Sequence, residues 1–194
     1  MKRALLVLLL FACATTPKPD LAALHSELLA MRAADQALRQ RWIAAGLTDE
    51  KLKAEAAALD AQHVARLQQI IDQLGGWPAK SLVGMDGSSA AWLIAQHGGR
   101  EFLHKVLPLM KKAAESGELP PASYALSEDR TRIQDGKKQV YGSQFNTRDG
   151  KCEPLPIEDP EHVDERRRSV KLDTLAEYTE QLCKTYGLTP TKSH

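Results

Sequence analysis

Apolar residues recur three or four positions apart along two long stretches in the first part of the chain. The first stretch covers 21–45, where apolar side chains alternate with charged ones at helical spacing. Asp20 stands before it as an N-cap, and Gly46 ends it. The second covers 48–74, with Thr48 as the expected N-cap. Two amphipathic helices joined by a few residues are expected to pack as an antiparallel pair.

Five shorter helical segments follow, bounded by glycine or proline. They are expected at 88–97, 101–116, 122–133, 160–170 and 174–186. We expect 80–84 to be a loop, and we expect Pro108 to kink the second of these helices or divide it in two. The pattern predicts a mainly α fold of about six to seven helices, in a single domain over 21–187 with a loose tail at 188–194.

The pattern changes from helical to extended near residues 138–157. Polar and apolar residues alternate over 139–145, turn-forming residues fill 146–150, and 151–157 is extended. This order predicts one β-hairpin, with two prolines that make its second strand an edge strand. The expected fold class is therefore mainly α with a small β element (α+β).

The first thirteen residues follow the pattern of an export signal. A basic start precedes an apolar run that ends at Phe11, which is too short to span a bilayer at roughly 20 residues per helix. The sequence Leu-Phe-Ala-Cys at 10–13 resembles the bacterial lipobox, whose cysteine is diacylated on sulfur before cleavage. We expect a signal peptide at 1–12 and lipid on Cys13. The alternative is an ordinary signal peptide that is cut at another residue.

A lipid on Cys13 would attach the protein to a membrane without a spanning helix. Two or more acyl chains hold a protein stably at a membrane, and the proline-containing stretch 13–20 is a short tether. Ala14 follows the cysteine where aspartate would signal retention, which in lipoproteins of Gram-negative bacteria implies the outer membrane. The expected location is the cell envelope, with the protein lipid-anchored at the outer membrane.

The charge balance argues against a nucleic acid partner. The chain has 26 basic and 25 acidic residues, for a net charge of +1, and the two signs are interleaved along nearly every segment. Removal of the signal would take two basic residues away and leave a net charge of about −1. Because the sequence has no basic stripe, we expect no nucleic acid binding, and the lipid anchor would have to supply the membrane attachment.

Two cysteines remain in the body of the chain if Cys13 carries lipid. In an oxidising compartment Cys152 and Cys183 could form a disulfide that fastens the hairpin region to the last helix. The closed loop would be worth about 3 kcal/mol on the loop-entropy model. The alternative is two free thiols packed as small apolar groups, and sequence spacing does not decide between them.

Short motifs occur in a distinctive order along most of the body. They are Gly-Trp-Pro at 76–78, Leu-Val-Gly at 82–84, Ala-Trp-Leu at 91–93 with Gln96 and His97, Leu-Pro-Leu-Met at 107–110, Asp129 with Arg130, Tyr-Gly-Ser-Gln-Phe at 141–145, and Pro-Ile-Glu-Asp-Pro at 156–160 with Val-Asp-Glu-Arg-Arg at 163–167. As a set they resemble an uncharacterised bacterial family, a domain of unknown function, from about Leu28 to Tyr178. The resemblance implies a shared fold and carries over no catalytic residue, substrate or cofactor.

His97 is the most suggestive polar residue for chemistry. It falls on the apolar face of the helix expected at 88–97, so its imidazole is expected to be partly buried near the helix end. A histidine there suits general acid or base catalysis, and it equally suits the capping of helix carbonyls. Asp129 and Arg130 complete the candidate catalytic set, with the arginine as a clamp for a substrate anion.

Five further polar residues are candidates for ligand binding: Gln96, Tyr141, Gln144, Asp164 and Arg167. Facing inward, they would line a pocket between the hairpin and the helices, where an arginine would hold a carboxylate or phosphate in bidentate fashion. The alternative is structural. In that case Asp129 pairs with an arginine to lock the hairpin to the helices, Tyr141 packs in the core, and the arginines at 166–168 form a solvated face.

A metal site is a third alternative, since His97, Glu101 and His104 could meet on one face. His162 and Glu165 form an equally incomplete pair. The sequence contains no HExxH motif, no phosphate-cradling glycine loop and no dinucleotide fingerprint. We therefore expect no metal and no cofactor.

Two functions fit these observations. The first is a non-enzymatic envelope lipoprotein whose domain binds an unknown protein or small-molecule ligand. The second is a small enzyme of hydrolase or transferase type that uses His97 as acid or base and Arg130 or Arg167 as an anion clamp. Convergence of the polar candidates around one water-accessible cavity would favour the enzyme, and their dispersal would favour a scaffold.

Overall fold

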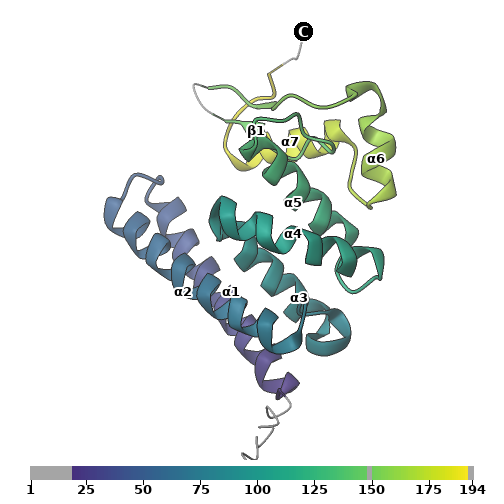
Figure 1. Cartoon of the computed structure of the whole chain (residues 1–194). Coiled ribbons are helices and arrows are strands. Elements are labelled where there is room, and N and C mark those ends of the chain that lie inside the picture. The colour runs from purple at the N-terminus through teal and green to yellow at the C-terminus, as the bar shows by residue number, and fades with distance from the viewer. Residues whose placement is uncertain (1–18, 148–149, 192–194) are drawn as a thin grey trace, which may run out of the picture.

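The computed structural model describes residues 19–147 and 150–191, which form seven α-helices, one short 3-10 helix and one β-hairpin (Figure 1). α1 (Leu21–Ala44) and α2 (Glu50–Leu74) make the predicted antiparallel pair. Asp20 caps α1 by accepting hydrogen bonds from two backbone N–H groups. The expected Thr48 cap on α2 is wrong by one residue, because the Asp49 carboxylate accepts from the first turn instead.

The middle of the molecule is built from α3 (Lys80–His97), α4 (Gly99–Glu115) and α5 (Pro121–Gln134) (Figure 1). α3 begins eight residues earlier than predicted. The expected loop at 80–84 is a helical turn that is interrupted at Val83 and Gly84, where the glycine has a φ of +71°. α4 continues through Pro108 as one helix, so the alternative of two separate pieces is wrong.

One large core joins the first five helices. Its centre consists of side chains with no exposed surface, among them Leu28, Leu67, Ile70 and Met110. A second, smaller cluster of Leu38, Leu52 and Ala56 lies toward the outer end of the α1–α2 pair, which projects beyond α3 and α4 in Figure 1. Truncation of one of the central leucines to alanine typically costs about 2–5 kcal/mol, so the large core is the main source of stability.

The hairpin consists of β1 (Phe145–Asn146) and β2 (Glu153–Pro154), paired antiparallel with Phe145 opposite Pro154. It lies in the predicted region, but it is much shorter than the pattern suggested. The alternating stretch that precedes β1 starts with one isolated bridge, between Gln139 and Ile157. It then continues as a loop with Gly142 at a φ of +71°, because the N–H groups of Val140, Tyr141 and Ser143 bind a buried carboxylate.

The C-terminal part continues with η1 (Pro160–His162), α6 (Val163–Ser169) and α7 (Leu175–Thr185). Thr174 and Glu177 form a capping box at the start of α7. Of the two alternatives for the cysteines, the structure contains the disulfide between Cys152 and Cys183, with Cα atoms 5.8 Å apart. Thr191 also pairs with Cys152 through two hydrogen bonds of 2.9 and 3.1 Å, so the start of the expected loose tail is attached to the hairpin.

The mainly α fold with one hairpin is confirmed. The predicted signal peptide, Cys13 and most of the expected tether lie outside the described residues. Among the residues that are described, no helix has the length and apolar character needed to cross a membrane.

Candidate functional site

A cavity of about 340 Å³ lies between α3, α5, the segment around β1, and α7. Four of the polar residues singled out in the sequence line it, and they are Gln96, His97, Arg130 and Gln144. Four others, Asp129, Tyr141, Asp164 and Arg167, are not among its lining residues. The remaining lining residues are Trp92, Leu93, Leu126, Ser143, Phe145, Thr147, Tyr178, Leu182 and Tyr186.

His97 stands at the last position of α3 and is held by a carboxylate from α1. Its Nδ1 lies 2.9 Å from Oδ1 of Asp35, whose side chain is 1% exposed. The same Nδ1 also lies 3.1 Å from Nε of Arg39, so a carboxylate and a guanidinium both meet this nitrogen, and Nε2 has no hydrogen bond among the described residues. A carboxylate that orients an imidazole in this way is a recurrent arrangement for acid–base chemistry.

Arg39 connects the same carboxylate to α2. Its Nε lies 3.0 Å from Asp35 Oδ1 and its Nη2 lies 2.6 Å from Asp60 Oδ1. Burial acts to raise the pKa of Asp35, but hydrogen bonds from His97 and Gln36 and the charges of His97 and Arg39 outweigh it and lower that pKa to about 2. Asp35 is therefore ionised and fully engaged at neutral pH.

Possible metal ligands gather at one point in the described part of the chain. Ligand atoms of Asp35, Asp60 and His97 lie within 4.8 Å of one another. The guanidinium of Arg39 contacts all three residues and supplies the positive charge there. The set considered in the sequence is not assembled, because His104 Nε2 lies 2.9 Å from Asp135 while His97 turns to Asp35.

Arg130 enters the cavity from α5 without a counter-ion. Within residues 19–147 and 150–191 its only hydrogen bond is from Nη1 to the Gln96 carbonyl, at 2.9 Å, and no carboxylate forms an ion pair with it. Its Nε is buried and has no partner. Burial is the main reason why the pKa of Arg130 lies below its ordinary value, yet an arginine side chain stays charged in proteins.

The two glutamines of the cavity are held in place. Gln96 donates from Nε2 to Ser127 Oγ at 2.6 Å, and this hydroxyl in turn donates to the Ser123 carbonyl. Gln144 donates from Nε2 to Ser143 Oγ at 3.1 Å. The polar floor of the cavity is therefore positioned by contacts within the protein.

Aromatic rings form much of the remaining wall. Tyr178, on α7, packs edge to face with Phe145, with ring centroids 5.8 Å apart. The guanidinium of Arg167 lies 4.9 Å from the centroid of the Tyr178 ring. Trp92 donates from Nε1 to Ser123 O at 2.8 Å and to Ser127 Oγ at 3.0 Å. Tyr186, at the rim, is 57% exposed.

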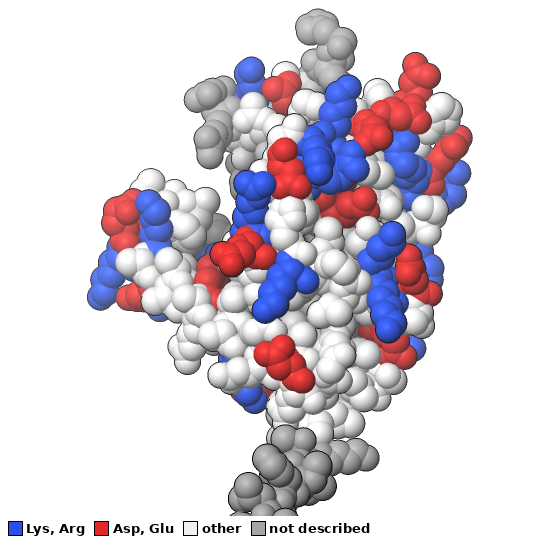
Figure 2. Space-filling model, viewed as in Figure 1, with Lys and Arg blue, Asp and Glu red and all other residues white. Residues whose placement is uncertain are grey.

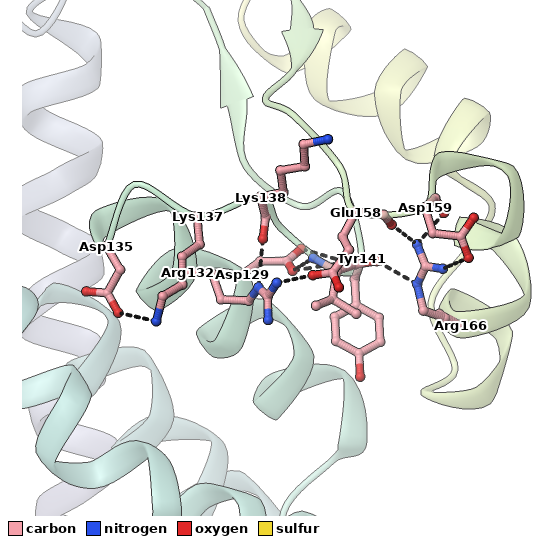
Figure 3. Close-up of polar contacts among 10 residues, drawn as sticks. Asp129, Arg132, Asp135, Lys137, Lys138, Tyr141, Glu158, Asp159 and Arg166 are labelled. Carbon is pink, nitrogen blue, oxygen red and sulfur yellow. Dashed lines mark hydrogen bonds and ion pairs between the residues drawn. The ribbon is translucent and has the colours of Figure 1, made fainter.

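Asp129 performs a structural task instead of the predicted catalytic one. Its carboxylate has no exposed surface and accepts hydrogen bonds from the backbone N–H groups of Val140, Tyr141 and Ser143 at 2.7–3.0 Å. Figure 3 shows the contact of Asp129 with Tyr141. The structural alternative foresaw an arginine as its partner, and this is also wrong, because backbone amides take that place. Asp129 thus binds the loop before β1 to α5.

The other three candidates outside the cavity also serve the fold. Arg167 donates to the carbonyls of Tyr141 and Asp173, and Asp164 accepts from the Leu175 N–H at the start of α7. The side chain of Tyr141 lines a separate surface pocket. Of these three residues, Arg167 contacts the cavity wall, because its guanidinium lies over the ring of Tyr178.

Two partly exposed arginines fasten the hairpin region from outside. Arg166 donates to the carbonyls of Val140, Glu158 and Asp159, and Arg132 pairs with Glu158 (Figure 3). Figure 2 shows acidic and basic residues mixed over the visible face, as the sequence indicated. This face therefore offers no large patch of one sign.

Sequence reasoning missed Asp35, Arg39 and Tyr178. A signal for Asp35 was present, since it lies on the buried stripe of α1 between Met31 and Leu38. A charge on such a stripe needs a buried partner. No comparable local signal marks Tyr178, because its position depends on how α7 packs.

The fold and the cavity define a small helical domain with a cavity lined by polar and aromatic residues. The chain matches the Family of unknown function (DUF6624) over residues 19–191, and it belongs to that family. Searches of curated proteins and of solved structures find no match to the chain.

Proposed function

We propose that this protein is a cell-envelope lipoprotein whose domain binds a small anionic ligand in the cavity between α3, α5 and α7. The cavity volume of about 340 Å³ lies within the usual range of small-molecule sites. The lining combines a few fixed polar groups with aromatic walls, which is the usual composition of such sites.

One observation carries this proposal: Arg130 is a partly buried guanidinium that no carboxylate neutralises within the described residues. A buried charge without a partner is costly, and natural proteins usually pair it. Its Nε is buried and has no acceptor, and the residue lines the cavity. An anion in the cavity would supply the missing negative charge.

The anion site can be tested by calorimetric titration of the full chain in detergent with acetate and with inorganic phosphate. We expect saturable binding to the natural protein and loss of at least about tenfold in affinity in Arg130→Met, the size of effect seen when a charged hydrogen bond is removed. Arg168→Met removes the same charge from an exposed residue and serves as the control. Equal binding by all three proteins would refute the site.

The membrane attachment rests on the lipobox-like sequence that ends at Cys13. We expect labelled palmitate to be incorporated into the natural protein and absent from Cys13→Ala. Cys152→Ala removes a cysteine that lies in the disulfide and should leave the labelling unchanged. Labelling that persists without Cys13 would refute this part of the proposal.

An acid–base enzyme is the second candidate, and the pair of His97 with Asp35 favours it. His97 lines the same cavity as Arg130, so a bound anion would lie near an oriented imidazole. Turnover of 4-nitrophenyl acetate or 4-nitrophenyl phosphate that disappears in His97→Gln would support the enzyme. Absence of turnover in a protein that still binds acetate would leave the binding function alone.

A further inference from the structure

We propose that the ligand is a compact aromatic carboxylate, whose carboxylate binds the guanidinium of Arg130 and whose ring packs among the aromatic walls of the cavity. This inference rests on the anion site proposed above. It adds the chemical class of the ligand, which follows from the geometry of the guanidinium, the charge around it, the wall composition and the size of the cavity.

The hydrogen bonds of Arg130 show which of its N–H groups are left for a ligand. Nη1 donates to the Gln96 carbonyl at 2.9 Å. Nε is buried and has no partner, and no hydrogen bond from Nη2 occurs within the described residues. Because Nε is enclosed by the protein, Nη2 is the donor that a ligand in the cavity would meet. A carboxylate oxygen accepts a strong, charge-assisted hydrogen bond from such a donor.

The charge around Arg130 fits a single negative charge better than two. Arg130 and His97 are the basic side chains of the lining, and His97 is engaged by the ionised Asp35. Arg39 is close by, but it is neutralised by Asp35 and Asp60. A phosphate dianion would carry two negative charges against the single uncompensated charge of Arg130, and the carboxylate of Asp35 beside His97 would repel it. A carboxylate monoanion would balance the charge of Arg130.

The walls favour a ring as the rest of the ligand. Four of the ten aromatic residues in the whole sequence line this cavity: Trp92, Phe145, Tyr178 and Tyr186. Three of these rings are already held by contacts within the protein, so little side-chain order would be lost on binding. Rings that are fixed at a site are well suited to stack with, or pack edge to face against, a ligand ring.

The volume limits the size of the ligand. About 340 Å³ is near the lower end of the range for small-molecule sites. It suits one or two fused rings with a short acidic substituent and excludes a long acyl chain or a folded partner segment. Gln96 and Gln144 could provide hydrogen bonds to ring substituents.

The test is calorimetric titration of the full chain in detergent with four probes: benzoate, benzamide, acetate and phenyl phosphate. Benzamide keeps the ring and removes the charge, and acetate keeps the charge and removes the ring. We expect benzoate to bind at least about fivefold more tightly than either, since each lost contact is worth on the order of one kcal/mol in comparable sites, which is about fivefold in affinity.

Variants separate the two contributions. Arg130→Met should abolish the advantage of benzoate over benzamide. Phe145→Leu should weaken benzoate by about threefold to tenfold, and it should weaken benzoate more than acetate. Tyr186→Leu, at an exposed rim position that does not endanger folding, should act in the same direction with a smaller effect.

The outcomes distinguish the inference from the function on which it rests. Acetate binding equal to benzoate binding, still dependent on Arg130, would keep the anion site and overturn the aromatic class. Tighter binding of phenyl phosphate than of benzoate would overturn the carboxylate. No binding of any anion would refute the proposed function itself.

Discussion

Asp129 and Arg130 are neighbours on α5, and the two side chains differ in how far the protein itself satisfies their charges. Asp129 has no exposed surface and is saturated by three backbone N–H groups of the loop before β1. Arg130 lines a cavity with one hydrogen bond and a buried Nε that lacks an acceptor. A buried charge away from the cavity belongs to the fold, and this includes Arg167, although its Nη2 also has no partner. A charge that lines a cavity and has no counter-ion points to a ligand.

Removal of the Asp129 carboxylate should have the largest effect on stability. Asp129→Ala leaves three buried N–H groups without an acceptor, and we expect a loss of about 3–5 kcal/mol in the free energy of unfolding. Urea denaturation measures it, with the exposed Glu161→Ala as control. A loss below about 1 kcal/mol would mean that these amides find other acceptors easily, and the contrast with Arg130 would fail.

The disulfide should rank second, because it joins α7, one wall of the cavity, to the chain beside β2. We expect the double variant Cys152→Ala, Cys183→Ala to lose about 3 kcal/mol, since the bond closes a loop of 31 residues in the unfolded chain. Reductant should lower the urea midpoint of the natural protein and leave that of the double variant unchanged. The same midpoint in both proteins without reductant would contradict this view.

Acid should weaken the contacts that Asp35 makes with His97 and Arg39. The pKa of Asp35 is lowered to about 2 in the folded protein from an ordinary value of 3.8, so this carboxylate contributes stability above pH 4 that is lost as the pH falls toward 2. The contribution is on the order of 2 kcal/mol. In Asp35→Asn, the fall in stability between pH 4 and pH 2 should be smaller by this amount, as followed by thermal unfolding. An unchanged acid profile would show that Asp35 is not engaged.

Removal of the Arg130 charge should change the free energy of unfolding least. Whether this free energy rises or falls shows if Arg130 belongs to the fold or to a ligand site. Without ligand, Arg130→Met removes a poorly compensated charge at the cost of one hydrogen bond, so we expect the free energy of unfolding to stay the same or rise by about 1 kcal/mol. Thermal unfolding beside Arg168→Met provides the comparison. A loss of about 3 kcal/mol or more would assign Arg130 to the fold, like Asp129, and would remove the basis for the ligand.

The helices could largely be predicted because their signals are local. Asp20 and the spacing of leucines define α1, and Thr174 with Glu177 defines the start of α7. The stretch before β1 could not be predicted in the same way. Its alternation favours a strand, but Asp129, more than ten positions earlier in the chain, takes its backbone N–H groups. The alternation of polar and apolar residues in a sequence does not reveal such a long-range contact.

The candidate site also contains residues that local sequence signals identify and residues whose role depends on long-range contacts. His97 and Arg130 were identified from residue type and position in the helix, and both reach the cavity. Arg167 has the same residue type, yet it lies behind Tyr178 and serves the wall. Only tertiary packing distinguishes these two arginines. Asp35 was open to prediction, because a carboxylate on a buried helical stripe requires a partner.

The most direct measurement of the central claim is the NMR signal of the Arg130 Nε–H group in the full chain, assigned by its loss in Arg130→Lys. Titration with acetate should shift this signal saturably, while the Nε–H signals of Arg167 and Arg168 stay in place. An Arg130 signal that does not move at saturating acetate, or one that moves no more than that of the exposed Arg168, would contradict an anion site in this cavity.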